Sequence, residues 1–174
     1  MISEESLNKR SLAHQGVFRH VFARNCAVRR ITSADACAFL EKYHLIGPLK
    51  GRYHYGLFLE RPGRSGLEAG TLVAVSVFSA ARTWQKGERT VRSFEWLRAA
   101  SLPDVRVAGG MGKLLQAFIA DAHPDDIMSY ADASWSSGAV YRTLGFRPDG
   151  SKTFPDGSSS LKFRLEIFHK NYQK

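Results

Sequence analysis

The spacing of apolar residues alternates along the chain between the period of a helix and that of a strand. Helical spacing joins Ala36, Phe39, Leu40 and Tyr43, and later Leu114, Leu115, Phe118, Ile119 and Ala122. The first helix is expected to begin near Thr32 to Asp35, with Ser33 as the candidate N-cap, and to end before Gly47-Pro48, because proline cannot continue a helix. The second runs from Met111 to His123-Pro124.

Segments rich in β-branched and aromatic residues predict the strands. They are Cys26 to Ile31, Arg52 to Leu59, Thr71 to Ser79, Thr90 to Arg98, Asp126 to Ala133 and Leu161 to Phe168. The second and third form a hairpin around an exposed loop, Pro62 to Gly66. A short helix before the last strand is capped by Ser136 or Ser137 and runs through Leu144, with Gly145 in the left-handed conformation. The order predicts a mixed α/β (α+β) domain with a central mixed, partly antiparallel twisted sheet flanked by helices.

Length and composition suit one folded domain. The chain has 174 residues, 44% of them hydrophobic, which is enough for one core. We expect a basic N-terminal arm over residues 1–25 and a single domain over residues 26–174. No apolar run approaches the ~20 residues that cross a bilayer, and the chain begins with polar and acidic residues, which predicts a soluble, cytoplasmic protein. Cys26 and Cys37 fit no metal-binding or disulfide spacing, so no metal site is expected.

The charge balance indicates an anionic partner. The chain has 25 Lys and Arg against 16 Asp and Glu, a formal net charge of +9. Such an excess favours a phosphorylated cofactor, a nucleic acid, or both. Basic residues gather early beside aromatic or histidine residues, at Lys9, Arg10, His14, Phe18, Arg19, His20, Phe22, Arg24, Arg29 and Arg30. They would suit a phosphate backbone with stacked bases, but a solvated basic arm has the same composition.

A glycine-rich turn precedes the second long helix. Gly109, Gly110 and Gly112 would let backbone N–H groups approach a phosphate, and the helix adds the positive end of its dipole. The same glycines would also serve a tight strand-to-helix connection without any ligand. The turn therefore predicts an anion site, with the structural alternative open.

Two segments resemble one enzyme superfamily. Val105 to Leu115 resembles the acyl-CoA pyrophosphate loop of the GNAT superfamily of N-acyltransferases, and Tyr141-Arg-Thr-Leu-Gly-Phe146 resembles its Tyr-x-x-x-Gly-Phe segment. The resemblance implies an N-acetyltransferase that uses acetyl-CoA or another acyl-CoA. The implied cofactor-binding residues are Arg106, Val107, Ala108, Gly109, Gly110, Met111, Gly112 and Lys113. The superfamily usually has Gln or Arg three residues before the first essential glycine, where this chain has Arg106 or Val107, depending on the register.

A narrower resemblance rests on other residues. His44 to Gly47, Arg82, Phe94 to Arg98, Gly109-Gly110 and Ser129 to Gly138 are similar to a phage-associated GNAT-like domain of Mom-type DNA-modification proteins and some homing endonucleases. This resemblance implies chemistry linked to nucleic acids. The aromatic C-terminal motif of many phage copies is replaced here by Thr153 to Ser158.

Acyl transfer from a thioester needs a neutral amine, a group that polarises the carbonyl, and a proton for the departing thiolate. The superfamily resemblance implies Tyr141 as the acid, although a buried tyrosine with a satisfied hydroxyl would look the same. Glu95 is a candidate base, with an ion pair to Arg98 or Arg82 as the alternative. Asp132 is a candidate base or substrate-orienting residue, or else a turn residue.

Other candidates lie further from the glycine turn in sequence. His44 could act as a base or bind an acidic group, or it could be structural before the Gly-Pro turn. Arg82 and Arg98 could contact a substrate phosphate or support the carboxylates, and Trp135 could stack on a base or lie in the core. Two functions follow: an N-acyltransferase whose acceptor amine is unknown, with a nucleobase among the acceptors considered, or a nucleic-acid-binding module without acetyl transfer. The sequence carries no signal for an oligomeric state.

Overall fold

The computed structural model describes residues 18–133 and 136–167, which form two compact units. The first unit comprises residues 1–78 and 98–122, and the second comprises residues 79–97 and 123–174. The long strand β6 (Arg89–Ser101) passes from the second unit into the first.

The first unit is built on antiparallel strands. Strands β2 (Cys26–Arg30), β3 (Tyr53–Leu59) and β4 (Leu72–Phe78) are neighbours in that order, and the end of β6 follows β4. Cys26 pairs with Leu59 and Tyr53 with Phe78, so the predicted hairpin of β3 and β4 is confirmed. The Leu102 amide donates to the Val73 carbonyl at 3.0 Å beyond the end of β6.

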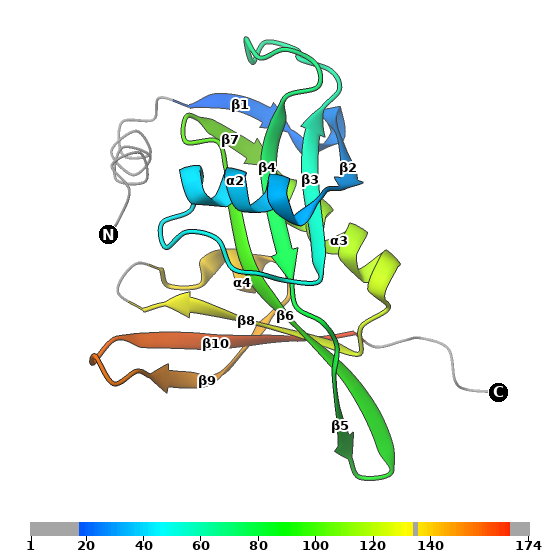
Figure 1. The fold of residues 1–174 in the computed structure, drawn as a ribbon, viewed down its shortest axis with the longest axis vertical. Helices are drawn as coiled ribbons and strands as arrows, with labels where there is room; N and C mark the ends of the chain where they lie inside the picture. The colour runs from blue at the N-terminus through cyan, green and yellow to red at the C-terminus, as the bar shows by residue number, and fades with distance from the viewer. Residues whose placement is uncertain (1–17, 134–135, 168–174) are drawn as a thin grey trace, which may run out of the picture. The chain divides into compact units, whose positions relative to one another are not determined.

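Helices α2 (Ser33–Tyr43) and α3 (Gly110–Ala122) cover opposite faces of this sheet (Figure 1). Phe118 of α3 stacks on Phe78 with ring centroids 3.9 Å apart, on the face that also carries Tyr55. Phe39 of α2 lies with Phe58 on the other face. The apolar stripes predicted from helical spacing are largely buried, at Ala36, Phe39 and Leu40 in α2 and at Leu114, Leu115, Phe118 and Ala122 in α3.

A second, two-stranded sheet belongs to the first unit and was not predicted. Strand β1 (Arg19–Phe22) pairs in parallel with β7 (Val105–Ala108), and the short 3-10 helix η1 (Ala23–Asn25) leads from β1 into β2. Val21 is 3% exposed and Val105 is 1% exposed, so one face of the pair is buried. Part of the stretch assigned to the basic arm therefore lies beside the strand that enters the glycine turn.

The second unit has strands β5 (Arg82–Lys86), the first part of β6, β8 (Asp126–Asp132), β10 (Ser159–Glu166) and β9 (Arg147–Thr153). Strands β6 and β8 are parallel, whereas the β5–β6, β8–β10 and β10–β9 pairs are antiparallel. The short helix α4 (Ala139–Thr143) lies between β8 and β9 in the chain. Parallel and antiparallel pairing together with the flanking helices confirms the predicted mixed α/β class.

Several local predictions need correction. Thr32, and not Ser33, caps α2, because its hydroxyl accepts from the Asp35 amide at 3.1 Å. Helix α4 has no side-chain cap, since Gly138 holds the cap position with φ +72°. Gly145 has φ +90°, which confirms its predicted left-handed conformation. Strands β5, β7 and β9 were missed; the β5 and β9 residues are exposed along their whole length and carry no buried apolar pattern.

Candidate functional site

The glycine turn of the first unit joins β7 to α3. Gly109 has φ +77°, in the left-handed region that favours glycine. A Cβ on Gly110 would lie 2.7 Å from Val107 Cγ1 and 3.3 Å from Leu57 Cδ2, so a larger residue has no room there. A tight strand-to-helix connection therefore requires glycine at Gly109 and Gly110, whether or not a ligand binds there. The same turn directs the first amides of α3, which have no partner within the helix, toward its N-terminal end.

A small cavity of about 170 Å³ adjoins this turn within the first unit. Its walls are small or flexible side chains of β4, the end of β6, β7 and α3: Ala74, Ala99, Ala100, Ser101, Val107, Gly110 and Met111. Three predicted cofactor-binding residues thus face one hollow. Its narrow, largely apolar walls suit a thin chain better than a bulky ring.

The two cations predicted near the turn have different surroundings. Lys113 Nζ donates to the backbone carbonyls of Ala23, at 2.9 Å, and of Cys26, so this side chain ties α3 to η1 and the start of β2. The Arg106 side chain is exposed on β7 and makes no hydrogen bond or ion pair with any other described residue. Arg106 is accordingly the better placed of the two to meet an external anion.

His44 and Arg98 come together at the end of α2 in the first unit. The Ile46 amide donates to His44 Nδ1 at 3.3 Å, and the Gly47 amide donates to the His44 carbonyl at 3.1 Å. Arg98 Nε donates to the Gly47 carbonyl at 3.2 Å. These contacts give both residues a structural role at this turn, in addition to any role in catalysis.

Tyr141 of α4 is the central polar group on one face of the second unit. Its hydroxyl lies 2.8 Å from Ser129 Oγ, and Ser129 also donates to the Trp96 carbonyl at 2.9 Å. A serine has one hydroxyl proton, and a carbonyl only accepts. Ser129 therefore donates its hydroxyl proton to the Trp96 carbonyl, and the Tyr141 hydroxyl donates to Ser129 Oγ.

Aromatic packing holds the Tyr141 ring in place. Its centroid lies 5.3 Å from that of Phe163, 5.5 Å from Phe146 and 6.1 Å from Trp96. Phe163 and Phe146 are 1% and 3% exposed. The ring is packed among aromatic side chains, as the structural interpretation of Tyr141 expected, and the hydroxyl contacts Ser129. Packing and an acid role are therefore compatible.

Glu95 and Asp132 lie on the sheet face opposite Tyr141. Glu95 is in register with Met128, and Trp96 with Ser129. Because side chains alternate along a strand, Trp96 and Ser129 share the Tyr141 face, whereas Glu95, Met128 and Asp132 share the other. Glu95 makes no ion pair with any described residue, so the alternative pairing with Arg82 or Arg98 is wrong. The Asp132 carbonyl accepts from the Ser136 amide at 2.9 Å, as at a turn.

Arg82 and Trp135 stay apart from these groups. Arg82 is exposed at the start of β5 and pairs in register with Ser93. Trp135 lies outside the described residues. Among the described residues, no group of three His, Cys, Asp or Glu side chains is arranged to hold a metal ion. No helix in the described ranges is both long and apolar enough to cross a membrane.

Sequence reasoning missed several buried polar groups. In the first unit Tyr55 donates to Asp121 at 2.7 Å, and Arg30 contacts both. Burial, and then the hydrogen bond with Asp121, raises the pKa of Tyr55, which keeps it protonated. Burial also raises the pKa of the Cys26 thiol, which disfavours the reactive thiolate. Ser129 alone had a readable signal, because it interrupts the buried alternation of Ile127 and Ala131.

The sequence matches no protein-family model, and no curated protein sequence matches it significantly. Solved structures do match. They include a GNAT-family acetyltransferase from Bacillus anthracis, 16% identical with a TM-score of 0.52 over 82% of this chain and 95% of that chain. The ribosomal-protein-S5-alanine acetyltransferase from Vibrio fischeri is 10% identical, with a TM-score of 0.55 over 86% of this chain and 96% of the other. An aminoglycoside acetyltransferase in complex with coenzyme A is 16% identical, with a TM-score of 0.51 over 81% of this chain and 94% of that chain. The chain therefore has the fold of the GNAT-family acetyltransferases.

Proposed function

We propose that this protein is an acyl-CoA-dependent N-acyltransferase, with acetyl-CoA as the donor and an amine as the acceptor. The observation that carries the proposal is the turn at Gly109 and Gly110, which opens α3 within a fold that acetyltransferases share. One of the similar structures is described as a complex with coenzyme A. We place the reaction in the cytoplasm, as the sequence predicts.

The residues around the turn fit a pyrophosphate. The first amides of α3 and the helix dipole favour a negative charge, and the uncommitted Arg106 adds a full positive charge. Lys113 contributes indirectly by holding η1 against α3. The adjoining cavity accommodates a narrow apolar chain. Bound acyl-CoA would supply the acyl group as a reactive thioester.

Tyr141 is proposed as the general acid. When the amine nitrogen forms its bond to the thioester carbonyl carbon, the carbon–sulfur bond breaks and the sulfur leaves as a thiolate. Tyr141 gives its proton to that thiolate, and for this its O–H turns away from Ser129, which holds it at rest. The proton lost by the amine passes to a carboxylate, with Glu95 and Asp132 as the candidates.

Calorimetric titration with acetyl-CoA and with CoA tests the cofactor part of the proposal. We expect saturable binding of one ligand per chain. Arg106→Ala should weaken binding about tenfold, because a charge-assisted contact to phosphate is lost. Arg82→Ala, an exposed arginine on a strand of the second unit, is the matched control and should bind as the wild type does. If the folded protein shows no binding heat at millimolar acetyl-CoA, the proposal is wrong.

Nucleic-acid binding is the second candidate, and a basic groove in the first unit favours it. This groove of about 540 Å³ is lined by Phe18, Arg19, His20, Val21, Phe22, Arg24, Asn25, Leu59, Arg61, Pro62, Gly63 and Arg64. None of the described residues that line it is acidic. Phe22 is 46% exposed, and the Arg24 guanidinium lies 4.8 Å from the centre of its ring. Exposed rings beside arginines suit unpaired bases on a phosphate backbone. If the same chain also transfers an acyl group, a nucleobase is the acceptor that we favour.

Fluorescence anisotropy with labelled single-stranded and duplex DNA tests this candidate. The association constant should fall steeply as salt rises, and the double variant Arg24→Ala, Arg64→Ala should show a shallower salt dependence. The control is Arg147→Ala, an exposed arginine of the second unit. A salt dependence that is flat, or unchanged in the double variant, would exclude the groove as a nucleic-acid site.

A further inference from the structure

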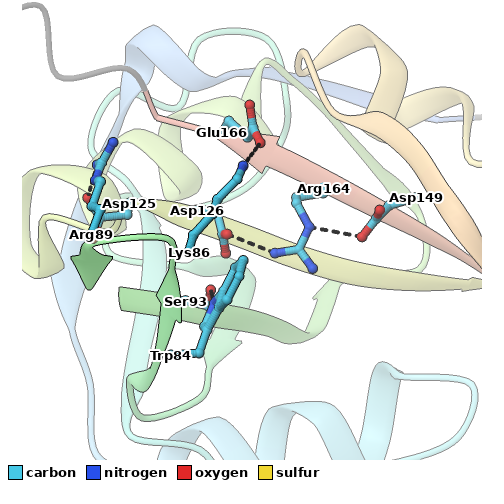
Figure 2. A network of polar contacts seen from close by, with 9 residues as sticks. All are labelled: Trp84, Lys86, Arg89, Ser93, Asp125, Asp126, Asp149, Arg164 and Glu166. Atoms are coloured by element: carbon cyan, nitrogen blue, oxygen red, sulfur yellow. Dashed lines mark hydrogen bonds and ion pairs between the residues drawn. The ribbon is translucent and has the colours of Figure 1, made fainter. Parts of the chain in front are cut away.

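A polar pocket lies within the second unit, on the sheet face opposite Tyr141. It has a volume of about 370 Å³ and is formed by residues of β5, β6, β8, β9 and β10. Asp126 of β8 lies at its base, with Trp84 of β5 and Arg164 of β10 beside it (Figure 2). We call this hollow the Asp126 pocket.

Every cation that lines the Asp126 pocket already has a carboxylate partner. Arg164 lies between Asp126, at 2.8 Å, and Asp149, at 2.9 Å (Figure 2). Arg89 pairs with Asp125 at 2.7 Å and Lys86 with Glu166 at 3.7 Å. The lining holds four carboxylates and three cations, so the local charge does not favour an anion.

One carboxylate oxygen of the pocket has no partner. Asp126 is 5% exposed; its Oδ2 accepts from Arg164, but its Oδ1 is buried without any hydrogen bond among the described residues. A buried charged oxygen without a donor is costly, and removing it from water is not offset by the other oxygen's ion pair. A molecule bound in the pocket can supply the missing donor.

Trp84 provides an aromatic wall for that molecule. Its side chain is fixed by a 2.7 Å hydrogen bond from Nε1 to the buried Ser93 Oγ, yet the residue stays 42% exposed. The face of an indole ring attracts cations. A fixed ring with an unpaired carboxylate oxygen is therefore suited to a positively charged N–H donor.

We propose that the Asp126 pocket binds a small organic cation with an ammonium or guanidinium group, which donates to Asp126 Oδ1 and lies against Trp84. Tyr141, Glu95 and Asp132, the groups proposed for acyl transfer, are not among the residues that line it. Asp126 begins β8 and Asp132 ends it, and at roughly 3.3 Å per residue these ends are about 20 Å apart. The pocket also lies on the opposite face from Tyr141.

Calorimetric titration with 1,4-diaminobutane, in the absence of acetyl-CoA, tests the proposal, with uncharged 1,4-butanediol as the control probe. We expect saturable binding of the diamine and none of the diol. Asp126→Asn should weaken diamine binding about tenfold or more, because a charge-assisted hydrogen bond is lost. Asp156→Asn, at an exposed turn, should leave binding unchanged.

Asp126→Asn could also unfold the protein, since it weakens the partner of Arg164. Trp84→Ala avoids this problem because the side chain lies on an exposed strand, and it should weaken binding about threefold or more, whereas Trp84→Phe should keep part of the affinity. Absence of saturable binding to folded wild type, which means that a buried water alone satisfies Asp126, would overturn the proposal. Equal binding of the diol, or unchanged affinity in Trp84→Ala, would overturn it as well. Neither result depends on whether acetyl-CoA binds.

Discussion

At the scale of single residues, the Tyr141 hydroxyl is the group whose surroundings bear most directly on acyl transfer. Tyr141→Phe removes the proton that it holds toward Ser129 but leaves its aromatic neighbours in place. With an amine that the wild-type protein acetylates, we expect turnover to fall about 100-fold or more, as it does when a general acid is lost. Acetyl-CoA affinity, measured by calorimetry, should change little.

Tyr130→Phe is the matched control for this variant. Tyr130 is the next residue after Ser129 on β8, and alternation directs its side chain to the other face. Its turnover should stay near the wild-type value. Equal losses in the two variants, or none in Tyr141→Phe, would remove Tyr141 from the mechanism.

The surroundings of Asp149 predict how the stability of the fold changes at low pH. Hydrogen bonds from Lys162, and then from Arg164, lower the pKa of Asp149 in the folded protein. A carboxyl whose folded pKa is depressed contributes stability above its unfolded pKa, which is about 4, and this contribution is lost as pH falls through the folded pKa. Urea denaturation from pH 6 to pH 3 should therefore show a shallower loss of stability in Asp149→Asn than in wild type. A variant curve parallel to that of the wild type would contradict this assignment.

At the scale of secondary-structure elements, the N-cap of α2 differs between prediction and structure: Ser33 was predicted, and Thr32 is observed. Thr32→Ala removes the hydroxyl that accepts from the Asp35 amide, and the free energy of unfolding should fall by about 1 kcal/mol. Ser33→Ala, at the position that the sequence suggested, should cost much less because Ser33 is already inside the helix. Chemical denaturation of the two variants decides between these positions, and the reverse order of stabilities would support Ser33.

The connection between β7 and α3 permits a second test at this scale. Gly110→Ala places a Cβ 2.7 Å from Val107, and we expect it to destabilise the protein by about 1–3 kcal/mol. Gly63→Ala is the control: Gly63 has φ +55° with nothing within 4 Å of its Cβ, so only backbone strain of about 1 kcal/mol is added. Thermal unfolding that shows Gly110→Ala as the milder change would contradict the close packing at this turn.

Elements with strong periodicity were predictable, whereas those without a buried stripe were not. Helices α2 and α3 were found from their apolar spacing, and β3, β4 and β8 from their β-branched and aromatic residues. Strand β5 is exposed throughout, so no alternation marks it, and β9 contains Pro148 and Gly150, which usually indicate a loop. Strand β1 depends on its partner β7, which lies far away in sequence.

The candidate site was predictable in part for the same reason. The glycine turn and Tyr141 belong to short motifs that are readable along the chain. The partners that define their surroundings are distant in sequence: Ala23 for Lys113, Trp96 for Ser129, and Arg164 for Asp126. Only the fold brings such groups together, so their hydrogen bonds and the Asp126 pocket had no signal in the sequence.

At the scale of the whole molecule, we propose that the start of α3 binds acyl-CoA. The fold is shared with acetyltransferases over more than 80% of this chain, at an identity of only 10–16%. Fold likeness alone does not fix a ligand, because one fold hosts many functions. A test of this claim must therefore locate the ligand on the chain.

Hydrogen–deuterium exchange of the full chain, with and without saturating acetyl-CoA, does this most directly. We expect slower exchange of the backbone amides from Gly109 to Gly112, because bound phosphates accept hydrogen bonds from them. The Trp84 to Arg89 hairpin, which belongs to the Asp126 pocket, should exchange at an unchanged rate. Unchanged exchange from Gly109 to Gly112 at a saturating ligand concentration would show that acyl-CoA does not bind at the start of α3.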